Sequence, residues 1–440
     1  MAEYTRPQNE EQFEQNFAQL KPLMNSTEAY YESSRCLFCY DAPCITACPT
    51  GIDIPLFIRQ INAGNSEGAA KTIYESNFFG YACGKICPTE VLCEGACVYN
   101  HQDVKPIEIG RLQSFATGGV IKANKHLFKL APENGKKVAV VGAGPAGLAA
   151  ACELRLEGYA VDVFEAKEKP SGLTVYGVAP YKITNAEALD EMKYLEAQYG
   201  YKVHYEKPIK AAADFEALEA NYDAIFLGVG LGDTRDLGLD GENLDGVTGA
   251  TEFIEKLRME HANVQVPDRV VVIGGGNTAM DAGSESARLG ASEVSLVYRR
   301  PKSQMGAYEF EYDLAKGVGV RGVFGVQPVA ILGKDRVEGV QFRKTEVIDG
   351  RVNEIAGSEF EIPCDMVILA TGQSKQKGLL SQIKGLELDR GGRIVVDATG
   401  RCGNTKYFAG GDAVNGGAEV VNGTAEGKVA GQGIHAMLQG

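Results

Sequence analysis

The residues of this chain best suited to chemistry are cysteines, and they gather near its beginning. Of the 11 cysteines, eight fall before residue 100. They form two runs with short spacings, Cys36-x2-Cys39-x4-Cys44-x3-Cys48-Pro49 and Cys83-x3-Cys87-Pro88-x4-Cys93-x3-Cys97. Thiols clustered this closely in a chain without an export signal indicate metal binding rather than disulfide bonds.

Two kinds of metal centre use such spacings. Close runs that end in Cys-Pro resemble ferredoxin ligation, where the last cysteine of a run commonly serves the other cluster. Two [4Fe–4S] clusters are the natural count for two runs. Four-cysteine zinc sites also begin with CxxC, but zinc carries no electrons. We therefore predict iron–sulfur clusters, with structural zinc as the alternative.

A first glycine-rich motif follows, Gly142-Ala143-Gly144-Pro145-Ala146-Gly147. It lies between a predicted strand, Lys137 to Val141, and a predicted helix, Ala146 to Leu156. Glycines there let the backbone turn tightly and approach a pyrophosphate at the positive end of the helix. The next predicted strand, Ala160 to Phe164, ends in Glu165, which is placed to accept hydrogen bonds from an adenosine ribose. This ordered set predicts a bound dinucleotide rather than a glycine-rich turn without ligand.

A second motif, Gly274-Gly275-Gly276-Asn277-Thr278-Ala279, follows the predicted strand Arg269 to Ile273. Here the next predicted strand, Glu293 to Tyr298, ends in Arg299-Arg300 instead of an acid. Guanidinium groups bind phosphate through two parallel hydrogen bonds, so two cations at the adenosine ribose favour NADP(H) over NAD(H). The alternative is that both arginines are solvated surface charges.

Two motifs near the end complete the set, Ala370-Thr371-Gly372 and Phe408-Ala409-Gly410-Gly411-Asp412. An aspartate before a helical stretch, Gly423 to Met437, can bind the ribityl or phosphate part of a flavin. The order of the four motifs resembles the flavoprotein disulfide reductase superfamily, which implies FAD and an NAD(P) module inserted into the FAD module. Many members reduce a cysteine pair beside the flavin, yet no CxxC or CxxxxC follows residue 97 here. Cys152, Cys364 and Cys402 are therefore expected to be structural, and the electrons to leave through the early cysteines.

The elements that must position these motifs differ along the chain. Glu11 to Lys21, Pro55 to Ala63 and Glu67 to Glu75 have helical periodicity, whereas apolar runs ending in glycine or charge follow a predicted linker, Lys122 to Lys137. We predict an α+β multidomain protein, an N-terminal all-α iron–sulfur domain followed by two Rossmann-like α/β domains. The predicted boundaries are 1–135 for the cluster domain, 136–265 and 374–440 for the two parts of the FAD domain, and 266–373 for the NAD(P) domain.

Composition excludes several classes. The formal net charge of -14 and the pI near 5.0 would repel phosphate backbones and anionic lipid, so we expect no nucleic-acid or membrane partner. The start, MAEYTRPQNEEQFEQ, lacks the basic and apolar regions of a signal peptide. Val138 to Leu154 is too short and too interrupted to span a bilayer. A cytoplasmic protein is expected.

Three stretches resemble a particular family, the pyridine-nucleotide subunit (PreT type) of bacterial dihydropyrimidine dehydrogenase. They are Ser34-Arg35-Cys36 through Cys48-Pro49, Cys87-Pro88-Thr89-Glu90-Val91-Leu92-Cys93, and Ile109-Gly110-Arg111-Leu112-Gln113. The resemblance implies one cluster on Cys36, Cys39, Cys44 and Cys97, and another on Cys48, Cys87, Cys93 and the amide oxygen of Gln113. Without the resemblance, Gln113 would be a polar helix residue, and Cys83 is left without a role. Ser171-Gly172, before Leu173, stands where the family has Gly-Gly, at a backbone contact to FAD.

The resemblance also implies a function. NAD(P)H would deliver hydride to FAD, the two clusters would carry electrons singly, and an FMN-containing partner subunit with a dihydroorotate-dehydrogenase-like barrel would reduce uracil or thymine. No side chain need act as a catalytic nucleophile. Two rivals remain: the small subunit of glutamate synthase or a related NAD(P)H oxidoreductase, and a non-catalytic iron–sulfur redox sensor.

Overall fold

The chain folds into two compact units, each built from separate stretches of sequence. The computed structural model describes residues 4–403 and 406–439. The smaller unit contains the chain up to Ala18 together with Tyr176–Tyr181 and Gly232–Ser374, and the larger unit contains Gln19–Val175, Lys182–Leu231 and Lys375–Gly440. No helix among the described residues is long and apolar enough to cross a membrane.

The larger unit begins with helices. They are α2 (Ser26–Ser34), α3 (Pro43–Thr46), α4 (Ile54–Asn62), α5 (Ser66–Ser76), α6 (Gly80–Ile86), the 3-10 turn η1 (Val98–Gln102) and α7 (Ile109–Ala123). Two of them, α4 and α5, coincide with predicted helices, because their apolar residues recur on one buried face. In the described residues, no strand precedes position 137, which confirms the all-α start of the predicted fold class.

A parallel five-stranded sheet follows in the same unit. Its strands are β1 (Lys137–Val141), β2 (Ala160–Phe164), β3 (Lys202–His204), β4 (Ala224–Leu227) and β14 (Tyr407–Ala409), in the order β14-β4-β1-β2-β3. The helices are α8 (Pro145–Leu156), α9 (Leu173–Tyr176), α10 (Asn185–Tyr199), α11 (Ala212–Asn221), α15 (Lys377–Leu380), α16 (Asp412–Asn415) and α17 (Val420–Gln439). Strands β1 and β4 are almost wholly buried, as expected for a parallel sheet covered on both faces.

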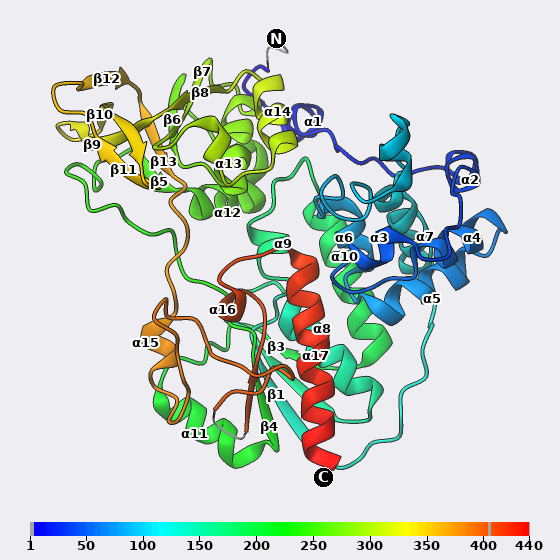
Figure 1. Cartoon of the computed structure of the whole chain (residues 1–440). Helices are drawn as coiled ribbons and strands as arrows, with labels where there is room; N and C mark the ends of the chain where they lie inside the picture. Colours follow the sequence, from blue (N-terminus) through cyan, green and yellow to red (C-terminus); the bar gives the residue numbers. More distant parts are fainter. Residues whose placement is uncertain (1–3, 404–405, 440) are drawn as a thin grey trace. The chain divides into compact units, whose positions relative to one another are not determined.

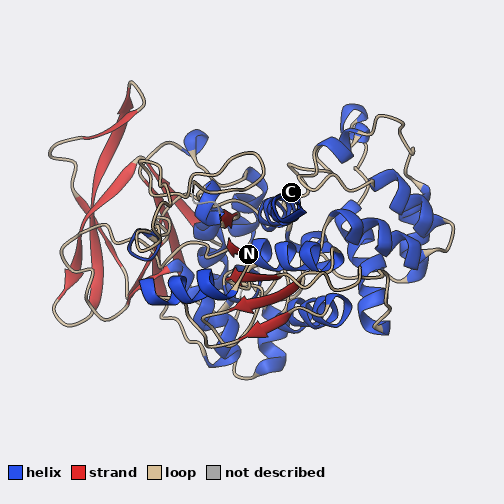
Figure 2. Ribbon diagram, turned by 90° about the horizontal axis from the view of Figure 1, so that it is seen from below, coloured by secondary structure: helices blue, strands red, loops and turns tan. Residues whose placement is uncertain are grey.

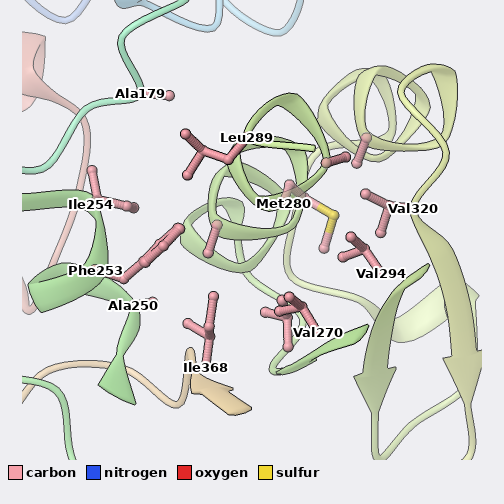
Figure 3. Close-up of a cluster of buried hydrophobic side chains, with 14 of the residues drawn as sticks. Ala179, Ala250, Phe253, Ile254, Val270, Met280, Leu289, Val294, Val320 and Ile368 are labelled. Carbon is pink, nitrogen blue, oxygen red and sulfur yellow. The ribbon is translucent and has the colours of Figure 1, made fainter. Parts of the chain in front are cut away.

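The smaller unit contains a second parallel sheet. Its strands are β5 (Val247–Gly249), β6 (Arg269–Ile273), β7 (Glu293–Tyr298), β8 (Arg321–Phe324) and β13 (Met366–Leu369), in the order β5-β13-β6-β7-β8. The helical elements are α12 (Ala250–Glu260), η2 (His261–Asn263), α13 (Asn277–Arg288), η3 (Lys302–Gln304) and α14 (Glu309–Gly317). Figure 3 shows part of its core, where Phe253 and Ile254 of α12 and Met280 of α13 lie over Val270 and Ile368 of the sheet.

An antiparallel sheet in the smaller unit was not predicted. It consists of β9 (Val326–Gly333), β10 (Val337–Ile348), β11 (Arg351–Glu354) and β12 (Phe360–Pro363), and β10 pairs with the other three. Figure 1 labels these strands, and Figure 2 shows all strands in red. Side chains alternate between more and less buried along the second half of β10. The turn Asp349-Gly350 connects β10 to β11. Both turn residues have positive φ, 49° and 75°, as a type I′ hairpin turn requires. An Asp-Gly pair between alternating segments could therefore have revealed this hairpin.

The first helix, α1 (Glu10–Asn16), belongs to the smaller unit and is shorter than the predicted helix Glu11 to Lys21. Phe13 and Phe17 are buried in the core of that unit. The amide of Asn16 donates to the carbonyl oxygen of Arg288 at 2.7 Å. Helix α1 ends at Asn16, and the chain enters the larger unit at Gln19.

Helix α17 packs tightly on α8, the helix that follows the first glycine motif (Figure 1). Gly423, Gly427 and Gly431, four residues apart, lie along the face of α17 that meets α8. A Cβ atom on Gly427 would lie 2.0 Å from the carbonyl oxygen of Ala146, and one on Gly431 would lie 2.9 Å from the Cβ atom of Glu153. Only glycine permits this close approach of the two helices.

We predict that Gly427→Ala destabilises the larger unit by about 1 to 3 kcal/mol, because the added methyl group must push α17 away from α8. Thermal unfolding with flavin fluorescence as the readout measures the loss. The matched control is Gly119→Ala in α7, where nothing lies within 4 Å of the added carbon. Equal melting temperatures for both variants would contradict the proposed packing constraint.

Candidate functional site

The first glycine motif forms a compressed strand-turn-helix corner between β1 and α8. Gly142 has φ of +101°, and a Cβ atom there would lie 2.4 Å from the carbonyl oxygen of Gly228, just after β4. A Cβ atom on Gly147 would lie 2.0 Å from the carbonyl oxygen of Gly142. Space is open beside Gly144, the N-cap residue of α8. The corner thus offers an open cradle at a helix N-terminus, which fits a pyrophosphate.

Glu165 lies at the carboxyl end of β2, as predicted, and is buried. Its two carboxylate oxygens accept hydrogen bonds at 2.8 Å, one from the backbone N–H of Ala143 and one from that of Lys167. Each oxygen retains acceptor capacity for a ribose hydroxyl. Glu165 therefore also fixes the glycine loop, a role that the sequence did not reveal.

The Ser171-Gly172 turn packs against this corner. The N–H of Ser171 donates to the carbonyl oxygen of Ala143 at 2.7 Å, and a Cβ atom on Gly172 would lie 3.1 Å from the Cα atom of Gly144. Ser171 adopts φ of +81°, a conformation that costs a residue with a side chain about 1 to 2 kcal/mol relative to glycine. Leu173 begins α9 beside this turn. Ser171 and Gly172 therefore border the cradle, and Leu173 follows them directly.

The Gly-Gly-Asp motif is held in place by a glutamate from α17. The N–H of Gly411 donates to Glu426 at 2.6 Å, and the side-chain amide of Asn415 donates to the same carboxylate at 3.0 Å. Asp412 accepts from the N–H of Ala418 at 3.1 Å. Burial raises the pKa of both Asp412 and Glu426, while Lys375 opposes the shift at Asp412. Glu426 was missed, because a polar residue in a glycine- and alanine-rich helix matches no motif. Asn415, the last residue of α16 just after the Gly-Gly-Asp motif, was missed as well.

The second glycine motif forms the equivalent corner in the smaller unit. A Cβ atom on Gly274 would lie 2.3 Å from the carbonyl oxygen of Ala370, and one on Gly275 would lie 2.4 Å from the ring of Tyr298. Space is open at Gly276, the N-cap residue of α13. The Ala370-Thr371-Gly372 motif follows β13, so its backbone lies beside the first glycine. Asn277 accepts from the N–H of Tyr308 at 3.0 Å, and Thr278 is exposed.

Arg299 and Arg300 lie immediately after β7. Arg299 is exposed, and Arg300 is half-buried. In the described parts of the chain, neither guanidinium has a carboxylate partner, and Nε of Arg300 is buried without an acceptor. The loop after them returns to the glycine motif, where the N–H of Ala307 donates to the carbonyl oxygen of Gly275 at 2.9 Å. Both cations therefore border the dinucleotide corner.

Four cysteines of the first predicted set line one pocket. The pocket wall contains Cys36, Cys39, Cys44 and Cys97 among apolar side chains such as Ile54 and Ile58. Burial raises the pKa of Cys36, and burial together with the neighbouring thiols raises the pKa of Cys44 to about 12. Thiolates this close repel one another, so cationic iron would offset their repulsion.

Within residues 4–403 and 406–439, no group of three or more His, Cys, Asp or Glu side chains is placed to hold a metal ion. The four thiols that line the pocket are the ligand type of a [4Fe–4S] cluster and also of a four-cysteine zinc site.

The second set of cysteines meets around α6. Burial is the largest cause that raises the pKa of Cys93. The nearby thiols of Cys48 and Cys87 raise this pKa further. A hydrogen bond with Cys83, followed by burial, raises the pKa of Cys87. Gln113 of α7 is buried, and its amide nitrogen donates to the carbonyl oxygen of Gly80 at 2.6 Å. Three predicted cysteine ligands therefore come together, with Gln113 of α7 and Cys83 of α6 as candidates for the fourth.

A buried carboxylate positions α6. Glu191 of α10 accepts hydrogen bonds from the N–H groups of Tyr81 and Ala82 at 2.6 and 2.9 Å, and from the hydroxyl of Tyr74 at 3.2 Å. Burial raises the pKa of Glu191 from 4.5 to about 7 against these hydrogen bonds. The folded state therefore binds the proton more tightly than the unfolded chain, and this group loses stabilising effect as pH rises through that range.

The comparisons with known proteins match two regions of the chain to two families. A family described as dihydropyrimidine dehydrogenase domain II, 4Fe-4S cluster, matches residues 13–125, and one described as pyridine nucleotide-disulphide oxidoreductase matches residues 136–427. The fold and the sites define a class, the NAD(P)H-dependent flavin and iron–sulfur oxidoreductase subunits. The chain belongs to the pyridine nucleotide-disulphide oxidoreductase family, in the branch that carries the N-terminal 4Fe-4S domain.

Two kinds of relative are equally similar. The NAD-dependent dihydropyrimidine dehydrogenase subunit PreT of Escherichia coli (strain K12) is 32% identical over 97% of this chain and 98% of its own length. The glutamate synthase [NADPH] small chain of the same organism is 32% identical over 96% of this chain and 94% of its own. Among solved structures, Mycobacterium tuberculosis FprA in complex with NADPH has a TM-score of 0.58 and 21% identity, covering 70% of this chain and 85% of that one. That likeness concerns the fold alone, and it confirms the predicted fold class.

We predict that Gln113→Ala removes one cluster, so that iron falls from on the order of eight atoms per chain to about four. The matched variant Cys83→Ser should keep its iron, because the resemblance assigns the fourth ligand to the glutamine. Iron analysis and electron paramagnetic resonance of anaerobically purified protein measure both. Iron loss in Cys83→Ser with none in Gln113→Ala would make Cys83 the ligand.

Proposed function

We propose that this chain oxidises NAD(P)H and passes the electrons through FAD and two [4Fe–4S] clusters to an FMN-containing partner subunit that reduces uracil or thymine. The single observation that carries the proposal is the composition of the larger unit, which contains the flavin motifs and both sets of cysteines. FAD, when bound, supplies hydride chemistry, and the clusters carry electrons singly. Clustered thiols favour a reducing compartment, the cytoplasm.

The residues that would hold each group support this assignment. FAD would rest on Gly142, Gly144, Pro145, Ala146, Gly147, Glu165, Gly172, Leu173, Gly411 and Asp412. The nicotinamide nucleotide would rest on Gly274, Gly275, Gly276, Asn277, Thr278, Ala370, Thr371 and Gly372. The clusters would bind Cys36, Cys39, Cys44 and Cys97, and Cys48, Cys87, Cys93 and Gln113. No protein nucleophile is needed.

The surroundings of the cysteines support an order of transfer. Glu419, just before α17 and after the Gly-Gly-Asp motif, lies close enough to Cys87 to contribute to the raised pKa of its thiol. This proximity brings the second set of cysteines toward the flavin motif. The ligand loop of the first set instead exposes Leu37 and Tyr40. Electrons would therefore reach the second cluster first and leave from the first.

The small chain of glutamate synthase gives a second candidate function, since relatives of that name are as similar as the PreT subunits. The partner would then be a large glutamate-forming subunit. The residues Arg35 and Gln113 lie in the stretches that resemble the pyrimidine branch, which is why that branch is preferred. The subunit that co-purifies with the natural protein distinguishes the two candidates.

We predict that the isolated chain oxidises NAD(P)H with ferricyanide but reduces neither uracil nor thymine, because the residues beyond the cluster region are taken up by the two nucleotide modules. An eight-fold barrel alone needs about 250 residues. Mixing with the correct FMN subunit should restore pyrimidine reduction, and Cys44→Ser should abolish the coupled reaction while retaining much direct dye reduction. Pyrimidine reduction by the isolated chain at the rate of the complex would refute the proposal.

Nucleotide preference rests on Arg299 and Arg300, whose guanidinium groups lack carboxylate partners among the described residues. We predict that Arg299→Ala with Arg300→Ala raises KM for NADPH much more than KM for NADH. Each charge-assisted phosphate bond contributes roughly 1.5 to 3 kcal/mol. Steady-state kinetics with both nucleotides is the measurement, and Arg351→Ala on the exposed strand β11 is the control. If the unaltered chain already uses NADH as well as NADPH, the preference is refuted.

A further inference from the structure

A lysine outside every sequence motif lies against the second set of cysteines. Nζ of Lys21 donates to the carbonyl oxygen of Cys87 at 3.0 Å and to the hydroxyl of Thr89 at 2.8 Å. Its side chain is only 18% exposed, so water screens its charge weakly. These contacts hold a positive charge on the turn that follows Cys87.

The charge of Lys21 is poorly compensated. The carboxylate of Glu90 is 4.0 Å away and 42% exposed. The carboxylate of Glu94, another nearby acid, accepts a hydrogen bond from the backbone N–H of Gly110 at 2.9 Å. A neighbouring cation, Lys85, has its own partner, because its Nζ lies 3.0 Å from the carboxylate of Glu187. Lys85 also donates to the carbonyl oxygen of Lys21 at 3.0 Å, which fixes the backbone of Lys21.

The ammonium group of Lys21 contacts the backbone of Cys87, a proposed ligand of the second cluster. Its positive charge favours any gain of negative charge beside it. Reduction adds one electron to a cluster that thiolates already make negative, so net charge and nearby dipoles set its potential.

We propose that Lys21 is a positioning residue that sets the reduction potential of the second cluster, holding a fixed positive charge beside Cys87 that stabilises the reduced state. The inference rests on the proposed ligand set. The electron comes from NAD(P)H through the flavin, and Lys21 neither gains nor loses a proton. Lys21 does not line the pocket of the first cluster, where the cation near Cys36 is Arg59.

The test is an anaerobic redox titration of the full chain with dithionite, followed by electron paramagnetic resonance. Cys93→Ser and Cys44→Ser assign each signal to a cluster. In Lys21→Met we expect the midpoint potential of the second cluster to become more negative while that of the first is unchanged. Lys21→Arg keeps the charge and should titrate like the unaltered protein. The control Lys71→Met removes an exposed lysine of α5 and should shift neither potential.

Lys21→Gln keeps a hydrogen-bond donor without the charge, and it replaces Lys21→Met if that variant loses iron. An unchanged second potential in the uncharged variant would overturn the inference. Equal loss of the second cluster in Lys21→Arg, Lys21→Met and Lys21→Gln would also overturn it, because the role would then be structural. Failure to find two cluster signals in the unaltered chain would instead refute the proposed function.

Discussion

The buried carboxylate of Glu191 is the contact through which the cluster region becomes part of the flavin-binding unit. It belongs to α10, within the nucleotide-binding part of the sequence, yet it accepts the first N–H groups of α6. That helix has no side-chain cap of its own, and a carboxylate at a helix N-terminus satisfies both its free donors and its dipole. Helix α6 carries Cys83 and leads directly to Cys87, so the position of the second cysteine set depends on Glu191.

A second acid on α10 extends this contact. Glu187 accepts from the hydroxyl of Tyr81 at 2.7 Å and pairs with the buried Lys85 at 3.0 Å. Breaking such a pair would leave an uncompensated charge in the interior. The same lysine touches the backbone of Lys21. A chain of polar contacts therefore runs from α10 through α6 to the cation beside Cys87, and it links the flavin module to the surroundings of the second set of cysteines.

Both nucleotide corners obey one steric rule. In each, the first glycine of the motif approaches the end of a neighbouring strand so closely that a Cβ atom would meet a carbonyl oxygen, at Gly228 in one unit and at Ala370 in the other. The motif residues at strand ends are small for this reason. In the larger unit, α17 adds a further close approach, and its Glu426 holds the Gly-Gly-Asp loop.

The sequence alone determined the local elements and the chemistry. Strands β1, β2, β6 and β7 have the predicted bounds, because apolar β-branched runs and flanking glycines are local signals. The cysteine spacings predicted a redox centre because closely spaced ligands are also a local signal. The hairpin of β10 and β11 was not predicted, although its Asp-Gly turn is also a local signal.

The tertiary structure determined features that the spacing of residues along the sequence does not encode. It placed α1 on the smaller unit, where Phe13 and Phe17 find an apolar core, and ended that helix early. It brought Glu191, Glu426 and Lys21 to the sites across long stretches of sequence. A buried charge is recognisable only from what surrounds it, since the free energy of its burial depends on partners contributed by other elements. The sequence therefore predicted which residues are candidates for the chemistry, and the fold showed which residues hold those candidates in place.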